Sequence, residues 1–184
     1  MKGFPMRLLA VTVLLLVATA AGAQPPKPVK FGPLSATPPA GWKAEKPANL
    51  LRSAQFKLPS ADDSLAAAEV AVFGEASPKV AEKFAEWRNT FVPAEGESAD
   101  KLGKVETFAM LGKTVATTLD VTGTWKYRER PRDPASKEEL RPDYRVVWAI
   151  LVNEDETTHL RLSGPAKVVA AHHEAFVAWL KSAK

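Results

Sequence analysis

The chain has 184 residues, of which 46% are hydrophobic and 25% are charged, and its formal net charge is +4. This composition is sufficient to form a buried core and is unlike that of a disordered chain. The sequence contains no cysteine, which excludes disulfides, thiolate metal sites, a cysteine nucleophile and a lipid anchor on cysteine. The length favours a single domain.

The first 23 residues have the order of a secretory signal peptide. Lys2 and Arg7 precede an apolar run over residues 8–20, which is shorter than the roughly 20 residues of a membrane-spanning helix. Small residues at 21–23 follow, as at a signal-peptidase site. We therefore predict a signal peptide over residues 1–23 and an exported, soluble protein of the periplasm or the extracellular space. The alternative is a buried N-terminal helix.

The charge of the expected mature chain is small. Removal of the signal peptide takes away two of the 25 basic residues and none of the 21 acidic ones, which leaves a net charge of +2. A charge this small gives no broad basic surface, which disfavours nucleic acid as a partner. No later apolar run has the length of a membrane span. We expect no transmembrane segment in the mature chain, and an unidentified protein or envelope component as its partner.

A proline-rich leader precedes the expected domain. Six of the 15 prolines fall within residues 24–40, and proline lacks the backbone donor that regular structure needs. We predict that this leader is extended and partly disordered. Phe31 and Leu34 are the residues that we expect to attach it to the domain, which spans residues 41–184.

Alternation of apolar and polar residues predicts about six strands in the domain. They cover residues 50–58, 67–73, 105–110, 114–125, 144–152 and 157–163. Short turns join strands that are adjacent in the sequence, so the sheet is expected to be mainly antiparallel. The run from Val146 to Val152 is apolar at successive positions, which predicts a central strand covered on both faces.

Two helices complete the predicted fold. Ser77 and Pro78 have the order of an N-cap followed by the first helical residue. The apolar stripe of this helix consists of Val80, Phe84, Trp87 and Phe91. A second helix is expected after Gly164-Pro165, with helical spacing of Val169, His172, His173, Phe176 and Leu180. We therefore predict an α+β fold, arranged as a layered α/β/α sandwich.

Several segments carry a family resemblance in their order and spacing. They are Gly41-Trp42, residues 51–59 and 68–73, Trp87-Arg88 with Phe91, residues 122–125 and residues 160–165. Together they resemble the PsbP-like fold of photosystem II extrinsic proteins and of a Ran-binding nuclear import factor, and most of all its small secreted bacterial relatives of unassigned function. The resemblance implies a non-catalytic binding or accessory module. Relatives often have Gly-Gly before the first helix, whereas residues 74–77 read Gly-Glu-Ala-Ser and offer no glycine-rich anion cradle.

The three histidines lack the spacing of a metal site. His172 and His173 are adjacent in a predicted helix and about 100° apart, whereas two ligands of one metal need a separation of three or four residues. His159 alternates with Leu160 and Leu162 in a predicted strand, so it is expected to face away from the more apolar side.

Other residue patterns also lack a complete site. Ser163-Gly164-Pro165 has no leading glycine of a nucleophile elbow. The acidic turns at 62–63 and 153–156 have no EF-hand pattern. We therefore predict no catalytic, cofactor-binding or metal-binding residue and no cofactor. Among the tryptophans, most are expected in the core, and Trp42 and Trp125 are alternatively an exposed recognition surface.

A charged segment over residues 128–143 is the candidate interaction loop. From Arg128 to Arg145 the chain has six basic and five acidic residues, a balance that disfavours a nucleic-acid groove. Long loops within compact domains are often functional. The candidate partner-binding residues are Arg128, Arg130, Arg132 and Arg141.

The function expected from the sequence is that of a secreted, non-enzymatic binding or accessory domain with an unknown partner. Two alternatives remain open at this point. One is an envelope- or polysaccharide-binding protein, and the other is a small extracytoplasmic hydrolase that uses one of the histidines.

Overall fold

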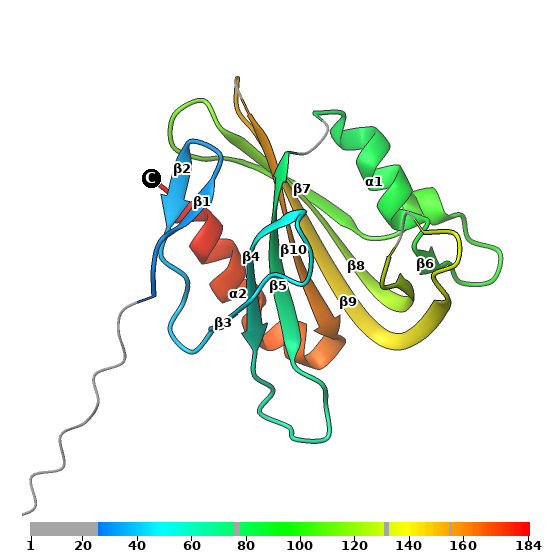
Figure 1. The fold of residues 1–184 in the computed structure, drawn as a ribbon. Coiled ribbons are helices and arrows are strands. Elements are labelled where there is room, and N and C mark those ends of the chain that lie inside the picture. Colours follow the sequence, from blue (N-terminus) through cyan, green and yellow to red (C-terminus); the bar gives the residue numbers. More distant parts are fainter. Residues whose placement is uncertain (1–25, 76–77, 131–132, 155) are drawn as a thin grey trace, which may run out of the picture.

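The computed structural model describes residues 26–75, 78–130, 133–154 and 156–184. The predicted signal peptide, Ser77 and Arg132 lie outside the described residues. The described part of the chain is an α+β fold with two α-helices, one large open antiparallel sheet of eight strands and a separate two-stranded sheet (Figure 1).

The large sheet has the strand order β3-β4-β5-β10-β9-β8-β6, and β7 pairs with β8 beside β6. The strands are β1 (Val29–Phe31), β2 (Leu34–Ala36), β3 (Lys43–Glu45), β4 (Arg52–Leu58), β5 (Ala68–Glu75), β6 (Phe91–Val92), β7 (Lys104–Ala109), β8 (Val115–Arg128), β9 (Glu138–Val152) and β10 (Thr157–Pro165). The sheet has more strands than the six predicted because β3 and β6 have only three and two residues, too few for a recognisable alternation.

Strand β9 lies in the middle of the sheet between β10 and β8, as predicted. All residues from Val146 to Leu151 are buried. One hydrophobic cluster contains Val147, Ala149 and Leu151. A second cluster contains Val146, Trp148 and Ile150. Because successive side chains of a strand point to opposite faces, the two clusters are the cores on the two faces of the sheet.

The first core lies between the sheet and α2 (Ala166–Lys181), with the β1–β2 hairpin beside the helix (Figure 1). Phe31 packs edge-on against Trp179 at 4.7 Å between ring centroids, and Leu34 is buried in the same cluster. Ser35 and Lys184 exchange two backbone hydrogen bonds. Phe31 and Leu34 therefore attach the leader to the domain, as expected, and the packed chain begins before residue 41.

The second core lies on the opposite face and is covered by α1 (Val80–Arg88). Trp87 stacks on Trp148 with ring centroids 5.3 Å apart and planes 9° apart. Two predictions for this helix are wrong. Lys79 is the N-cap, so Pro78 precedes the helix, and Phe91 belongs to β6. The helix ends early because Phe91 is paired with Trp125 of β8 and buried there.

The predicted loop over residues 128–143 is also shorter than expected. Residues 138–143 extend β9, and Glu138 pairs with Arg128 at the end of the β8–β9 hairpin. The register shifts between Gly123 and Trp125, so a bulge accommodates Pro142, which has no backbone donor. Asp143 has a φ of 53°. Proline and charge predicted a loop here, whereas a bulge allows the strand to continue.

Two further expectations concern exposure. Trp42 and Trp125 are both buried, so neither forms an exposed recognition surface. Leu50, the first residue of the strand predicted over residues 50–58, is fully exposed because β4 begins at Arg52. Among the described residues, no helix has the length and apolar character that a membrane crossing requires.

Candidate functional site

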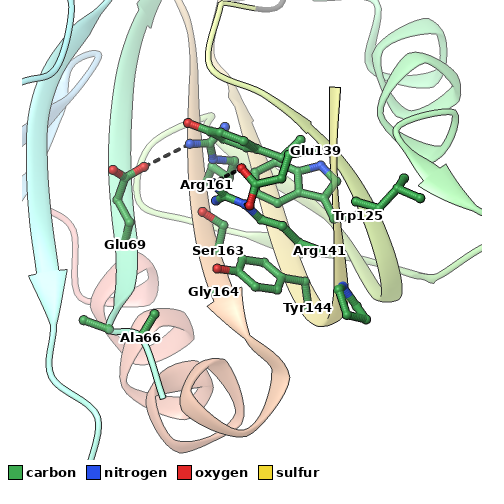
Figure 2. A pocket seen from close by; sticks show the side chains of 13 residues that line it. Ala66, Glu69, Trp125, Glu139, Arg141, Tyr144, Arg161, Ser163 and Gly164 are labelled. Atoms are coloured by element: carbon green, nitrogen blue, oxygen red, sulfur yellow. Dashed lines mark hydrogen bonds and ion pairs between the residues drawn. The ribbon is translucent and has the colours of Figure 1, made fainter. Parts of the chain in front are cut away.

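A pocket of about 510 Å³ opens on the sheet face that carries α1 (Figure 2). Its lining side chains come from β5, β8, β9 and β10 and from the turn before β5, and none comes from α1. Arg161 of β10 is among the lining residues and is hydrogen-bonded to Glu69 of β5. We call this cavity the Arg161 pocket.

Strand alternation places Arg161 in the pocket. Leu160 and Leu162 are buried in the α2-side core, so Arg161 and Ser163 face the other side of the sheet. Arg161 Nη2 donates a hydrogen bond to Glu69 Oε1 on β5 at 2.9 Å (Figure 2). Only 16% of the Arg161 side chain is exposed. Burial lowers the pKa of its guanidinium below the ordinary value, and Glu69 acts in the opposite direction.

Glu69 serves two guanidinium groups at once. Its Oε2 atom lies 2.8 Å from Arg52 Nη1, whose side chain is 11% exposed. The Nε atoms of Arg52 and Arg161 are buried and have no hydrogen-bond partner. Arg52 also donates to Gln55 Oε1 at 2.7 Å, and Gln55 Nε2 donates to the exposed Glu45 at 3.2 Å. A polar network therefore crosses β3, β4, β5 and β10 and ends in the pocket.

Aromatic rings and a second arginine form the other wall. The Arg141 guanidinium carbon lies 3.6 Å from the centroid of the Tyr127 ring and 5.6 Å from that of Tyr144. Arg161 lies 5.4 Å from the Trp125 ring. These distances allow cation–π attraction. Because all five side chains line one pocket, it combines positive charge with flat apolar surfaces.

The four arginines predicted from the sequence have different places. Arg141 lines the pocket and forms two hydrogen bonds to Glu139, at 3.1 and 3.0 Å. Arg128 lies 3.3 Å from Glu138 and is exposed. Arg130 lies 3.0 Å from Asp133, and Arg132 is outside the described residues. The structure therefore brings only one of the three described arginines into the pocket.

Sequence reasoning missed the main residues of this site. Arg161, Glu69 and the rings of Tyr127 and Tyr144 were not among the candidates. One signal was present, since Arg161 stands between two leucines in a predicted strand. A charge on a strand that is covered on both faces needs a partner, and this partner is Glu69.

His159 faces away from Leu160 and Leu162, as expected, but that face is also covered. Its ring stacks on Phe73 with centroids 4.2 Å apart. Burial, together with the nearby charges of Arg161 and Lys83, lowers the pKa of His159 to about 4. His159 is therefore neutral at pH 7.

His172 and His173 have separate contacts on α2. The Nε2 atom of His172 lies 2.9 Å from the carbonyl oxygen of Pro59, and that of His173 lies 3.7 Å from Asp120 Oδ2. In the part of the chain that the structure describes, no group of three or more histidine, aspartate or glutamate residues is arranged to hold a metal ion.

The pocket serine has no histidine close to it. Ser163 and His159 are four residues apart on β10, which separates their Cα atoms by about 13 Å. His172 and His173 belong to α2, which packs on the opposite face of the sheet. A nucleophile and its base must lie within hydrogen-bond distance, about 3 Å. The three histidines therefore do not form a catalytic pair with Ser163.

A second cavity of similar volume, about 510 Å³, lies beside the N-terminal segment. Its lining includes Pro26, Pro28, Val29 and Phe56. Lys27 and Lys30 also line it, and both are exposed. The lining of this cavity contains no buried charged group that could select a ligand by its charge, whereas the Arg161 pocket does.

Comparison with known proteins gives no family assignment. No protein-family model matches the chain, and no curated protein matches it.

Proposed function

We propose that the protein is an exported, non-enzymatic binding domain and that the Arg161 pocket is its ligand site. The observation that carries this proposal is the position of Arg161. Its guanidinium is held by Glu69 at 2.9 Å, lines the pocket and lies beside the Trp125 ring. Binding sites typically combine apolar walls with a few fixed polar groups, and this arrangement has both.

The fold proposed for this domain is a PsbP-like α/β/α sandwich of three layers. The positions of α1 and α2 on opposite faces of the sheet support it, as does the order of strands and helices. Family members of this type are binding or accessory modules, which agrees with a pocket built for recognition.

The arrangement of the pocket also supports a non-enzymatic role. The Cα atoms of Ser163 and His159 are about 13 Å apart. The pocket carboxylates of Glu69 and Glu139 each accept hydrogen bonds from arginine. The hydrogen bonds from Arg141 lower the pKa of Glu139, which makes it a weaker general base, and both oxygens of Glu69 are engaged by guanidinium groups. These groups are therefore better suited to holding a ligand than to moving protons.

The binding site can be located by amide chemical-shift mapping. The ¹⁵N-labelled chain from Gln24 is titrated with a mixture of small acids, neutral aromatic compounds and monosaccharides. We expect the largest shifts at the Trp125 indole and at the backbone of Tyr127, Arg161 and Ser163. A Tyr127→Ala variant should lose these shifts. Shifts confined to the cavity beside Phe56, or no shifts with any compound, would contradict the proposal.

Export is tested separately from binding. The proposal requires the chain to leave the cytoplasm and to lose residues 1–23. Intact-mass measurement of the protein from the periplasm or medium should give a chain that begins at Gln24 without an acyl group. A mass that includes the first 23 residues would show that the segment is not a cleaved leader.

A further inference from the structure

The charges around Glu69 do not balance. Its two carboxylate oxygens each contact one guanidinium, Arg161 at 2.9 Å and Arg52 at 2.8 Å. One negatively charged carboxylate is thus paired with two positively charged guanidinium groups. Glu45 joins this network through Gln55 and is exposed, so water already solvates its charge. The buried part of the network carries one positive charge in excess.

The second arginine of the pocket adds nothing to that excess. Arg141 forms two hydrogen bonds with the carboxylate of Glu139, which balances its charge. Lys83, the other cation near His159, forms an ion pair with Glu86 at 2.7 Å. His159 itself is neutral at pH 7. The net charge of the pocket and of the network behind it is therefore +1, shared by Arg161 and Arg52.

Flat side chains surround this charge. Trp125 is buried beside Arg161, and Tyr127 and Tyr144 are half-buried beside Arg141. A ring that enters the pocket can pack against these aromatic groups, which favour offset or edge-to-face contact. The cavity volume of about 510 Å³ falls in the range of small-molecule sites.

We infer that the Arg161 pocket binds a small monocarboxylate whose acid group is carried on a ring. This inference rests on the binding function proposed above. The carboxylate contacts the Arg161 guanidinium, and the ring packs beside Trp125. A carboxylate matches the planar donor geometry of arginine, and its single charge cancels the single excess charge of the network.

The same charge count disfavours phosphate. Inorganic phosphate carries between one and two negative charges at pH 7, so it brings more charge than the network can compensate. Burying an uncompensated charge is costly. Phosphate also has no ring that could pack against the aromatic side chains of the pocket. A neutral ring compound can pack against them but leaves the guanidinium charge unpaired.

The test is isothermal titration calorimetry at pH 7 in a buffer free of carboxylate and phosphate. Five compounds are compared, namely 2-naphthoate, its neutral amide 2-naphthamide, glucuronate, glucose and inorganic phosphate. We expect 2-naphthoate or glucuronate to bind about tenfold or more tightly than its neutral counterpart, as charge-assisted hydrogen bonds imply. A preference for 2-naphthoate over 2-naphthamide identifies the ligand as an aromatic acid. A preference for glucuronate over glucose identifies it as a sugar acid.

Two substitutions test the charge argument. Arg161→Gln removes the contacting group, and Arg52→Gln removes the excess charge from behind Glu69 without altering the pocket lining. Each should reduce the acid-to-neutral affinity ratio towards one. Arg161→Gln is expected to fold because Glu69 keeps Arg52 as its partner, and near-UV circular dichroism checks this. Arg128→Gln is the matched control, because Arg128 lies at the end of the same hairpin, outside the pocket lining, and is paired with Glu138. It should leave the ratio unchanged.

The outcomes separate this inference from the proposed function. Equal affinity for acid and neutral compounds, tighter binding of phosphate, or a ratio that survives both Arg161→Gln and Arg52→Gln would overturn the carboxylate inference and leave a binding pocket in place. If none of the five compounds binds while shift mapping detects another ligand in the pocket, the ligand class is wrong. If shift mapping also detects nothing, the binding function fails with it.

Discussion

The guanidinium group of Arg141 lies 3.6 Å from the centroid of the Tyr127 ring. This contact forms one wall of the Arg161 pocket and joins β8 to β9 near the bulge at residues 142–143. Glu139 fixes the other side of the guanidinium through two hydrogen bonds. The wall is therefore held by a cation–π contact and an ion pair together.

A double-mutant cycle measures the contact between these two residues. Arg141→Gln and Tyr127→Leu are made singly and together, and unfolding free energies are obtained by denaturant titration. We expect a coupling of about 0.5–1 kcal/mol, the range of a partly exposed cation–π pair. Tyr127→Phe keeps the ring and should retain most of the coupling. A coupling near zero would mean that the contact does not stabilise the pocket wall.

Replacement of Trp148 by alanine tests the core beneath α1. Trp148 is 4% exposed and stacks on Trp87, so Trp148→Ala should lower the free energy of unfolding by about 3–5 kcal/mol. Trp87→Ala should cost less because Trp87 is only half-buried. In the same denaturant titration, Arg128→Gln should stay within about 0.5 kcal/mol of wild type. A similar loss in the Arg128 variant would show that the end of the hairpin is structural.

Gly164 allows β10 and β5 to approach closely next to the pocket. A Cβ atom at this position would lie 2.8 Å from both Cα and Cβ of Ala68, which is buried. Gly164→Ala must therefore push the two strands apart, and we expect it to cost about 1–3 kcal/mol of unfolding free energy. Gly74→Ala, with nothing within 4 Å of its Cβ position, is the control. Equal stability of the two variants would contradict the close approach.

His159 makes stability depend on pH in a defined window. Its pKa is about 4 in the folded protein, against an ordinary value of 6.5. Between these values the unfolded chain takes up a proton that the folded chain does not, so stability should fall as the pH decreases from about 6.5 to about 4. The expected loss is about 3 kcal/mol. It is measured by denaturant titration at a series of pH values.

Substitution isolates the effect of this histidine from that of the carboxylates. His159→Gln has no proton to gain, so its stability should change less than that of wild type across the same pH range. His172→Gln is the matched control, because it removes a histidine from α2 on the opposite face of the sheet. If His159→Gln and wild type have parallel pH profiles, His159 is not the group responsible.

The sequence predicts the centre of the fold better than its edges. The apolar run at 146–152 and the alternation around Leu160 depend on burial, which the order of residues records directly. The hairpin end at 138–143 was missed because Pro142 and its charged neighbours resemble a loop, and the bulge opposite Gly123 becomes visible only once β8 and β9 are paired. Likewise, the end of α1 depends on the pairing of Phe91 with Trp125.

The candidate site was found only in part for a similar reason. The charged segment over residues 128–143 predicts Arg141 as a binding residue, and Arg141 lines the pocket. Arg161 and Glu69 are 92 residues apart and meet because β10 lies beside β5. That strand order joins segments distant in the sequence, which local patterns do not encode. A shared carboxylate between two arginines is a property of the folded sheet.

The most direct test of the binding site is a crystal structure of the chain from Gln24, soaked separately with 2-naphthoate and with glucuronate. We expect ligand density in the Arg161 pocket, with a carboxylate within hydrogen-bond distance of the Arg161 guanidinium and a ring beside Trp125. Density in the cavity beside Phe56 instead, with the Arg161 pocket occupied by water at saturating ligand, would contradict it.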